Sequence, residues 1–465
     1  MARFTWTSDR VREALSIPET GFASREYAAV CTDTRTLAPG DLFVALRGER
    51  FDGTDFVGAA ADAGAGGAVV ERRRLEDAPE DFELFVVDDA LQALGRLAAM
   101  RRRALDPTVV AITGTSGKTT TRELLAVALG AGAYASPSNF NNLVGVPLSI
   151  LAAPESAEIW VLELASNQPG EIERLAGIAE PDYAMITSVS EGHLEGLGDF
   201  QGVLDEKLAL LGDLRPGGRA LVADEPAELT RQARQRWSDV RTVGLSERAD
   251  EWPERWSLSA DGVEWTWKGV DFALPGFGKH LVQDGLFAAA AAEMLGVELR
   301  EIAERLKEAK LPPMRGEVRR LGDLLLLVDC YNANPSSFRA AIDSLNALAT
   351  GRRRAVLAGT MLELGQRSQP LHREVAEAML AAGIELIAAT GEFIRAFSQP
   401  AAHACEALIL EDDLDTAYRK LANRLQGDEA VLLKASRGMR FERAIPLFER
   451  DFGNPVAIKA SGSER

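Results

Sequence analysis

The stretch that decides the fold is Val109-Val110-Ala111-Ile112-Thr113-Gly114-Thr115-Ser116-Gly117-Lys118-Thr119-Thr120-Thr121. Its first five residues are β-branched or small and predict a buried strand. Two glycines then predict a turn, and the residues from Arg122 to Leu129 predict the first turns of a helix. Because a helix begins where the turn ends, backbone N–H groups and the helix dipole favour an anion at the turn.

The residues of this turn predict a phosphate site. Lys118 adds a full positive charge, and Thr119 supplies a hydroxyl that suits a magnesium ion. The full phosphate-loop pattern has a glycine at the position that Ile112 occupies here, so the loop is the shorter form Gly-x-x-Gly-Lys-Thr-Thr. The alternative is an ordinary glycine turn with a solvated lysine. The order of strand, turn and helix favours the phosphate site.

Composition and charge exclude several classes of function. The length of 465 residues suggests about three domains, and a hydrophobic fraction of 46% is enough for packed cores. Acidic residues outnumber basic ones, 70 against 52, and the net charge of −18 disfavours nucleic acid and anionic membranes as partners. The three cysteines, Cys31, Cys330 and Cys405, lack metal-ligand spacing and fit a reducing compartment.

A cytoplasmic protein without membrane insertion is therefore expected. The first residues are rich in charge, unlike a signal peptide. The most apolar helix pattern, Leu286 to Leu295, contains Glu293 and is too short to cross a bilayer.

Strand and helix patterns alternate along the chain and predict an α/β protein of three domains. Residues 1–86 form a small N-terminal α/β domain, and residues 87–313 form a central domain of phosphate-loop type with a mostly parallel sheet. Residues 314–465 form a Rossmann-like, doubly wound domain. Leu311-Pro312-Pro313 is the clearest hinge signal in the chain.

The expected strands cover residues 41–46, 68–70, 84–87, 109–113, 159–163, 183–188, 324–329, 355–358, 386–389 and 430–433. The expected helices cover residues 55–63, 90–104, 200–211, 281–295, 299–310, 337–348, 370–381 and 414–425, besides the one that follows the glycine turn. A tryptophan-rich stretch from 255 to 275 alternates like strands and predicts a peripheral sheet.

Polar residues follow the central strands where they end. Glu163 ends one strand, at the edge of a parallel sheet where ligands bind. His193 follows the next strand and is a candidate ligand of magnesium or phosphate, although a lone histidine is more often structural. Lys207, taken alone, is an ordinary solvated lysine. A nearby loop offers amide donors and acceptors to a polar ligand, unless it is a simple turn: Asn139, Asn141 and Asn142.

The last domain has three stretches rich in reactive side chains: Asp329-Cys330-Tyr331-Asn332-Ala333-Asn334-Pro335, Met361-Leu362-Glu363-Leu364-Gly365 and Lys434-Ala435-Ser436-Arg437-Gly438. The first lies between a strand and a helix. No glycine-rich dinucleotide fingerprint precedes that helix, which argues against a nicotinamide cofactor.

Together these stretches resemble the Mur ligase family, the ATP-dependent amide-bond ligases of peptidoglycan precursor synthesis, over nearly the whole chain. The resemblance depends on Asp33–Arg35 with Gly40–Leu46, on Asn139–Asn142 with Gly145–Leu148, on Tyr331–Pro335 and on Met361–Gly365. They are most similar to the members that join D-alanyl-D-alanine to a UDP-N-acetylmuramoyl tripeptide. The resemblance implies a monomer with these two substrates and ATP, and Mg²⁺ as a cofactor.

The resemblance also implies the roles of single residues. Lys118, Glu163, His193 and Lys207 would be catalytic. Thr119 and Glu163 would hold one magnesium ion and His193 a second, beside Lys207, which in the family is commonly carbamylated. ATP would contact Gly114, Thr115, Ser116, Gly117, Lys118, Thr119, Thr120, Arg315, Asp329 and Asn332. The other substrates would contact Thr34, Arg35, Asn139, Asn141, Asn142, Asn334, Lys434 and Ser436.

The implied reaction needs no side-chain nucleophile. A substrate carboxylate attacks the γ-phosphoryl group of ATP, and the dipeptide amine then displaces phosphate from the acyl phosphate. Acyl phosphates hydrolyse, so closure of the last domain at Pro312-Pro313 would exclude water.

The chain departs from the family at a few positions. Leu281 and Asp284 stand where the family has asparagines, which puts adenine recognition in question, and Thr360 and Ser188 differ from the usual aspartate and asparagine. Two alternatives remain: a related ligase for a different amino acid or a folate, and a nucleotide-binding regulator without turnover.

Overall fold

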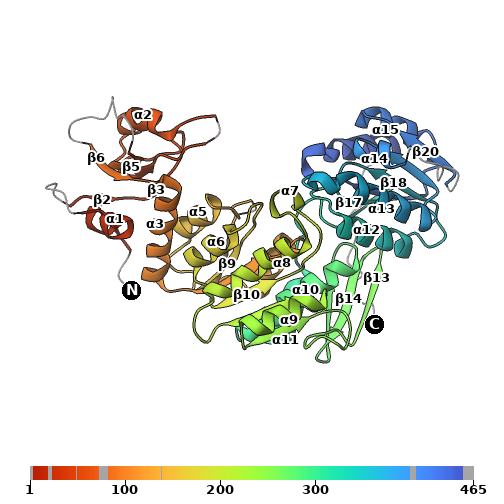
Figure 1. Cartoon of the computed structure of the whole chain (residues 1–465). Coiled ribbons are helices and arrows are strands. Elements are labelled where there is room, and N and C mark those ends of the chain that lie inside the picture. The colour runs from red at the N-terminus through yellow and green to blue at the C-terminus, as the bar shows by residue number, and fades with distance from the viewer. Residues whose placement is uncertain are drawn as a thin grey trace.

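The computed structural model describes residues 4–18, 24–48, 50–72, 82–137, 139–397 and 405–453. Strands and helices form three successive groups, which run from the N-terminal group at the left of Figure 1 to the C-terminal group at the right. The fold is α/β, as predicted from the alternating patterns. The exact domain boundaries, residues 86 and 313, stay predictions. The end of the predicted third domain, residues 454–465, lies outside the described residues.

The N-terminal group holds a parallel sheet of β3 (Val30–Cys31), β4 (Leu42–Val44), β5 (Gly67–Glu71) and β6 (Glu83–Val87). A short antiparallel pair, β1 (Trp6–Thr7) and β2 (Glu26–Tyr27), accompanies α1 (Ser8–Leu15). The strand predicted from residue 41 is shorter, because the Asp41 carboxylate accepts a hydrogen bond from the Ala38 N–H and closes a turn there. The helix predicted from residue 55 begins earlier, as η1 (Gly53–Phe56), and continues as α2 (Val57–Asp62).

The central sheet is parallel throughout, in the order β12-β11-β10-β7-β9-β8. Its strands are β7 (Thr108–Thr113), β8 (Ala133–Ala135), β9 (Ile159–Glu163), β10 (Tyr183–Ile186), β11 (Arg219–Ala223) and β12 (Val240–Val243). The buried strand β7 lies between β9 and β10, with Ile112 opposite Glu163 and Thr113 opposite Ile186. This order brings the residues that follow three strands to one edge of the sheet.

Helices cover both faces of the central sheet (Figure 1). They are α3 (Ala90–Leu105), α4 (Lys118–Leu129), α5 (Gly145–Ala152), α6 (Glu171–Ala179), α7 (Leu194–Leu197), α8 (Phe200–Leu208), α9 (Ala227–Arg236), α10 (Lys279–Met294) and α11 (Leu299–Lys307). Helix α4 begins at Lys118 and not at Arg122, since the first helical turn tolerates the three threonines. The helix predicted to reach residue 211 ends at Leu208 and continues as the 3₁₀ helix η2 (Ala209–Asp213).

The predicted peripheral sheet is confirmed as three antiparallel strands, β13 (Arg255–Ser259), β14 (Gly262–Trp267) and β15 (Val270–Leu274). Trp265 stacks on Phe272 with ring centroids 5.1 Å apart, and both side chains are buried. The stacked rings therefore join two neighbouring strands of this sheet.

The C-terminal sheet has the order β16-β17-β21-β18-β19-β20 and is parallel except for β16. Its strands are β16 (Glu317–Leu321), β17 (Leu324–Asp329), β18 (Arg354–Ala358), β19 (Leu386–Ala389), β20 (Ala407–Leu410) and β21 (Ala430–Lys434). Its helices are α12 (Pro335–Leu348), η3 (Gly365–Arg367), α13 (Ser368–Ala381), α14 (Glu392–Ala396), α15 (Leu414–Ala422), η5 (Arg437–Met439), η6 (Phe441–Ala444) and α16 (Ile445–Phe452). The predicted doubly wound pattern is confirmed, although β16 and β20 were not predicted.

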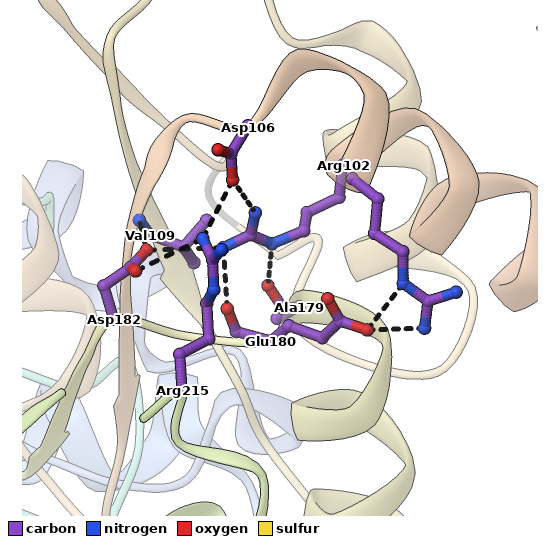
Figure 2. A network of polar contacts seen from close by, with 8 residues as sticks. Arg102, Asp106, Val109, Ala179, Glu180, Asp182 and Arg215 are labelled. Carbon is purple, nitrogen blue, oxygen red and sulfur yellow. Dashed lines mark hydrogen bonds and ion pairs between the residues drawn. The ribbon is translucent and has the colours of Figure 1, made fainter. Parts of the chain in front are cut away.

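Arg102 joins α3 to the central sheet where the chain enters β7 (Figure 2). Its buried guanidinium donates to the carbonyl oxygens of Ala179 and Glu180, at 2.8 and 2.7 Å. It also lies 3.3 Å from a carboxylate oxygen of Asp106 and of Asp182. The two carbonyls belong to the end of α6, where no residue of the helix can pair them, so Arg102 supplies their donors.

We expect Arg102→Met to lower the free energy of unfolding by about 3 kcal/mol, because it leaves the buried carbonyl acceptors without donors and Asp182 with Arg215 as its remaining cation. The control is Arg103→Met, since the neighbouring side chain is 63% exposed and its pair with Glu180 lies at the surface. That change should cost less than about 1 kcal/mol. Urea unfolding followed by circular dichroism measures both, and equal losses would contradict the role assigned to Arg102.

Candidate active site

The turn after β7 is built so that only glycine fits at two positions. Gly114 has φ +150°, and a Cβ there would lie 2.3 Å from the Thr187 hydroxyl. Gly117 has φ +85°, and a Cβ there would lie 2.4 Å from the Asp284 carboxylate. Gly117 is also the residue from which α4 begins, so the first N–H groups of the helix face the turn. The local structure is therefore that of an anion site.

Lys118 lies over this turn. Its Nζ donates to the carbonyl oxygen of Gly114 at 2.6 Å and lies 3.5 Å from that of Thr115. Desolvation lowers the pKa of the lysine from its ordinary value, and the charge of Glu163 opposes this shift. A cation with carbonyl partners alone is available to the phosphate groups of a ligand.

Glu163 is buried at the end of β9, and one of its two carboxylate oxygens accepts hydrogen bonds while the other accepts none in the described part of the chain. Oε1 accepts hydrogen bonds from the Thr119 hydroxyl at 3.1 Å and from the Asn141 amide at 2.9 Å. Oε2 lies 3.3 Å from the guanidinium of Arg122 and has no hydrogen-bond partner among the described residues. Arg122 is itself fully buried in α4. An oxygen without a hydrogen bond, beside a hydroxyl, is a donor set that suits a hard cation.

His193 and Lys207 lie close to this group. His193 precedes α7, and its Nδ1 lies 2.5 Å from the Glu363 carboxylate of the C-terminal group. Lys207 is 1% exposed, so its interpretation as a solvated lysine is wrong. Its Nζ donates to the Ser166 hydroxyl at 2.8 Å. Desolvation, together with the charge of Lys118, lowers the pKa of Lys207 to about 7.

One cleft of about 1760 Å³ collects most of the predicted residues. Its walls include the turn from Thr115 to Thr120, together with Asn141, Asn142, Glu163, His193, Arg315, Asp329, Asn332, Asn334 and Lys434. Gly114 lies behind the turn, and Lys207 reaches the cleft through Ser166, which lines it. Lys118, Glu163 and His193 therefore line one cleft, and Lys207 lies behind Ser166 in its wall; their catalytic roles stay predictions.

The C-terminal group supplies one wall of the cleft. The Asn334 amide donates to the Ser116 hydroxyl at 3.0 Å, and its carbonyl oxygen caps α12. Lys434 is buried at the end of β21 and pairs with Asp329 at 2.5 Å. The contact of Asn334 with Ser116 joins residues 218 positions apart, so the C-terminal group touches the central group at the phosphate turn.

Besides Glu163, through Oε2, and His193, through Nδ1, two more cleft residues have buried polar atoms without a hydrogen bond in the described part of the chain. They are Arg315, through Nε, and Asp284, through Oδ2. The Arg315 guanidinium lies over the Tyr331 ring, 4.0 Å from its centroid. Burial raises the pKa of Asp284 to about 8, which favours its protonated form at neutral pH. Asp284 therefore offers a polar ligand both a donor and an acceptor, as an asparagine would.

Some predicted substrate residues lie away from the cleft. Thr34 and Arg35 belong to the N-terminal group, where the Arg35 side chain is 86% exposed and pairs with Asp33. Asn139 is exposed beside the cleft, whereas Ser436 is buried behind it and accepts a hydrogen bond from the Leu362 N–H at 3.0 Å. Whether these four contact a substrate stays a prediction.

Sequence reasoning missed two residues of the site. Arg122 was predicted only as part of a helix. A charged residue at a position of that helix that faces the sheet could have indicated a buried ion pair. Glu363 belonged to a quoted stretch without an assigned role, and its contact with His193 depends on how two groups meet. The departure at Asp284 was noticed, but its burial against Gly117 was not.

The donor set fits magnesium in part. Among the described residues, no three His, Cys, Asp or Glu side chains cluster as a ready-made metal site. Glu163 and the Thr119 hydroxyl fit one ion whose remaining ligands come from phosphate and water. His193 and Lys207 fit a second ion once the lysine amine has been converted to a carbamate. No helix in the described part of the chain is long and apolar enough to cross a membrane.

Comparisons with known proteins agree with this geometry. Models of the Mur ligase family match residues 26–102 (catalytic domain), 112–292 (middle domain) and 314–437 (glutamate ligase domain). A relative from Bacillus subtilis, named UDP-N-acetylmuramoyl-tripeptide--D-alanyl-D-alanine ligase, is 34% identical over 449 residues, which is 94% of this chain and 96% of the relative. A protein of the same name from Escherichia coli is 35% identical over 80% of this chain and 82% of its own length.

Solved structures give the same result. MurF from Acinetobacter baumannii superposes with a TM-score of 0.85 at 29% identity, and the match covers 96% of this chain and 99% of the other. MurF from Thermotoga maritima in complex with ADP superposes with a TM-score of 0.80 at 28% identity, over 91% and 97%. Because family models match three stretches that together cover most of its length and a relative is 34% identical over 94% of it, the chain belongs to the Mur ligase family.

Proposed function

We propose that this protein joins D-alanyl-D-alanine to UDP-N-acetylmuramoyl-tripeptide, with ATP converted to ADP and phosphate, in peptidoglycan precursor synthesis. The observation that carries the proposal is the shared cleft, in which the Lys118 turn, Glu163 and His193 face Asp329, Asn334 and Lys434. The names of the similar proteins supply the substrates. We further propose that the protein acts in the cytoplasm as a monomer.

The chain's own residues account for the first step. The N–H groups at the start of α4 and the Lys118 ammonium group hold the β- and γ-phosphates, and Arg315 adds charge from the far wall. Bound magnesium, held by Thr119, Glu163, His193 and the Lys207 carbamate, would neutralise the charge that keeps the substrate carboxylate from the γ-phosphoryl group. The carboxylate oxygen bonds to phosphorus as the bond to ADP breaks.

The second step needs dry surroundings and an oriented amine. The dipeptide amine attacks the acyl carbon, the bond from that carbon to the phosphate oxygen breaks, and the departing phosphate takes up the proton that the amine gives up. The C-terminal wall, fixed by the contact of Asn334 with Ser116, covers the phosphate turn and limits the entry of water. We assign the UDP end of the substrate to the N-terminal group, through Thr34 and Arg35, and the dipeptide to the C-terminal group, through Lys434 and Asn334.

The direct test is phosphate release by the purified protein. Release should require ATP, magnesium, the UDP-muramoyl tripeptide and D-alanyl-D-alanine together. Replacing the dipeptide by single amino acids or by a folate tests the related-ligase alternative. Release that proceeds at the same rate without the dipeptide would contradict the proposal, and ATP binding without any turnover would support the regulator instead.

Lys118→Met should lower kcat by about 10³, because it removes the full charge aimed at the transferred phosphoryl group. Lys307→Met is the control, since this lysine is 46% exposed and pairs with Glu304 at the surface of α11. Steady-state phosphate release gives both values. If Lys118→Met kept more than about a tenth of the activity, Lys118 would not bind the transferred group.

Carbamylation of Lys207 can be tested directly by NMR spectroscopy. A buried amine with a pKa of about 7 is about half neutral at that pH, and the neutral form is the one that reacts with carbon dioxide. After incubation with ¹³C-bicarbonate, a carbamate carbon signal is expected in the NMR spectrum of the wild type and is expected to be absent in Lys207→Arg. The variant should also lose at least about 10² in kcat. A wild-type spectrum without this signal, in a fully active sample, would disprove the modification.

A further inference from the structure

The segment from Met361 to Gly365 lies between β18 and η3. Two consecutive backbone N–H groups of this segment donate hydrogen bonds to side chains outside it. The Met361 N–H donates to Nε2 of His372 at 2.9 Å, and the Leu362 N–H donates to the Ser436 hydroxyl at 3.0 Å. The next residue, Glu363, has φ +64°, a left-handed conformation that costs a non-glycine residue about 1 kcal/mol or more. The two amide contacts therefore hold a backbone shape that the chain would not adopt unaided.

This turn is where the C-terminal group meets His193. The Glu363 carboxylate lies 2.5 Å from His193 Nδ1, and the Glu363 carbonyl oxygen accepts a hydrogen bond from the Glu195 N–H at 3.2 Å. Helix α7, which His193 precedes, lies beside the C-terminal group in Figure 1. A Cβ on Gly365 would be 3.2 Å from the Glu195 Cα, so the backbones approach closely here. A displacement of the turn would move the partner of His193.

His372 is fully buried on α13, and both ring nitrogens have fixed partners. Nδ1 lies 2.7 Å from the Ser368 carbonyl oxygen, which can only accept, and Nε2 faces the Met361 N–H, which can only donate. Nδ1 therefore carries the proton and Nε2 the lone pair. The edge of the ring packs against Phe393, with centroids 4.7 Å apart. The ring has one orientation and one tautomer.

A histidine with a purely structural role in the core would be expected to form its hydrogen bonds with groups far from the cleft. Here the partner is the amide two residues before Glu363, on the segment that reaches His193. Protonating or removing the ring leaves the buried Met361 N–H without an acceptor, which costs about 1–3 kcal/mol and is relieved if the turn moves. The position of Glu363 and the state of His372 are thus linked through one peptide group.

We propose that His372 is a positioning residue, which acts through the Met361 amide to hold the Glu363 turn and thereby the side chain of His193. Its effect on rate rests on the proposed ligase function, whereas the positioning of His193 does not. The residue touches no substrate and acts only through the turn.

The test compares variants that keep or remove the acceptor. His372→Gln can place an amide oxygen near the Met361 N–H, while His372→Leu has no acceptor. His372→Asn keeps a donor for Ser368 but is too short to reach Met361, and it replaces the leucine variant if circular dichroism shows that variant to be unfolded. Glu363→Gln removes the charge that the turn delivers to His193.

In phosphate-release assays we expect His372→Leu and Glu363→Gln each to lower kcat about tenfold, with little change in KM for ATP. The double variant should lose no more than the worse single one, because both changes break one chain of contacts. His372→Gln should recover most of the rate. Losses that multiply in the double variant would overturn the proposal.

A second readout needs no activity. The sequence has four histidines, so ¹⁵N-imidazole NMR spectra are simple and can be assigned by substitution. The signals of His193 should move alike in His372→Leu and Glu363→Gln and stay near the wild-type positions in His372→Gln. Unmoved His193 signals in a folded His372→Leu would show a role in the core alone. If the wild type shows no dipeptide-dependent phosphate release, the ligase function fails, and these spectra still decide the positioning.

Discussion

The carboxylate of Glu163 lies out of water between the Thr119 hydroxyl and the Arg122 guanidinium, and the rest of the site is arranged around it. A buried carboxylate is costly unless its charge is balanced and its oxygens are paired. Arg122 and Asn141 supply part of that balance, and one oxygen keeps no hydrogen bond. The residual demand for positive charge is what makes this position suitable for a cation in the cleft.

The same demand explains how an acidic protein can handle anionic reactants. With a net charge of −18 the surface repels polyanions, so attraction has to be local. The positive groups Lys118, Lys207 and Arg315 lie in or beside one cleft, where the dielectric is low and their fields are strong. Burial, and after it the charge of Lys118, lowers the pKa of Lys207. Burial beside a second cation thus favours the neutral, reactive amine of Lys207.

The features that could be predicted from the sequence are those that depend on a local pattern of residues. The strand, glycine turn and helix around Lys118 were found from residue types alone, and Glu163 was found because strand ends in parallel sheets bind ligands. His193 was a candidate ligand from its place after a strand, whereas its pairing with Lys207 needed the family resemblance, since Lys207 has no local signal. Contacts between groups, such as that of Glu363 with His193, were beyond prediction because they depend on where two separately folded sheets meet. Burial of Lys207 was missed because it depends on how α8 packs against the segment of Ser166 within the central group.

Three contacts that join the C-terminal group to the central one near the cleft are polar. Asn334 meets Ser116, Glu363 meets His193, and Arg367 meets Glu191. Polar contacts of this kind contribute little net energy each, because water replaces them readily when the groups separate. An interface that has to admit three substrates and release three products needs that property. Precise closure of the C-terminal group on the central group must then depend on the shape of the contacting segments. The turn at Glu363 has to be rigid before it meets His193, so that a weak contact forms in one orientation. A buried imidazole that fixes a single amide provides such preorganisation without strengthening the interface itself.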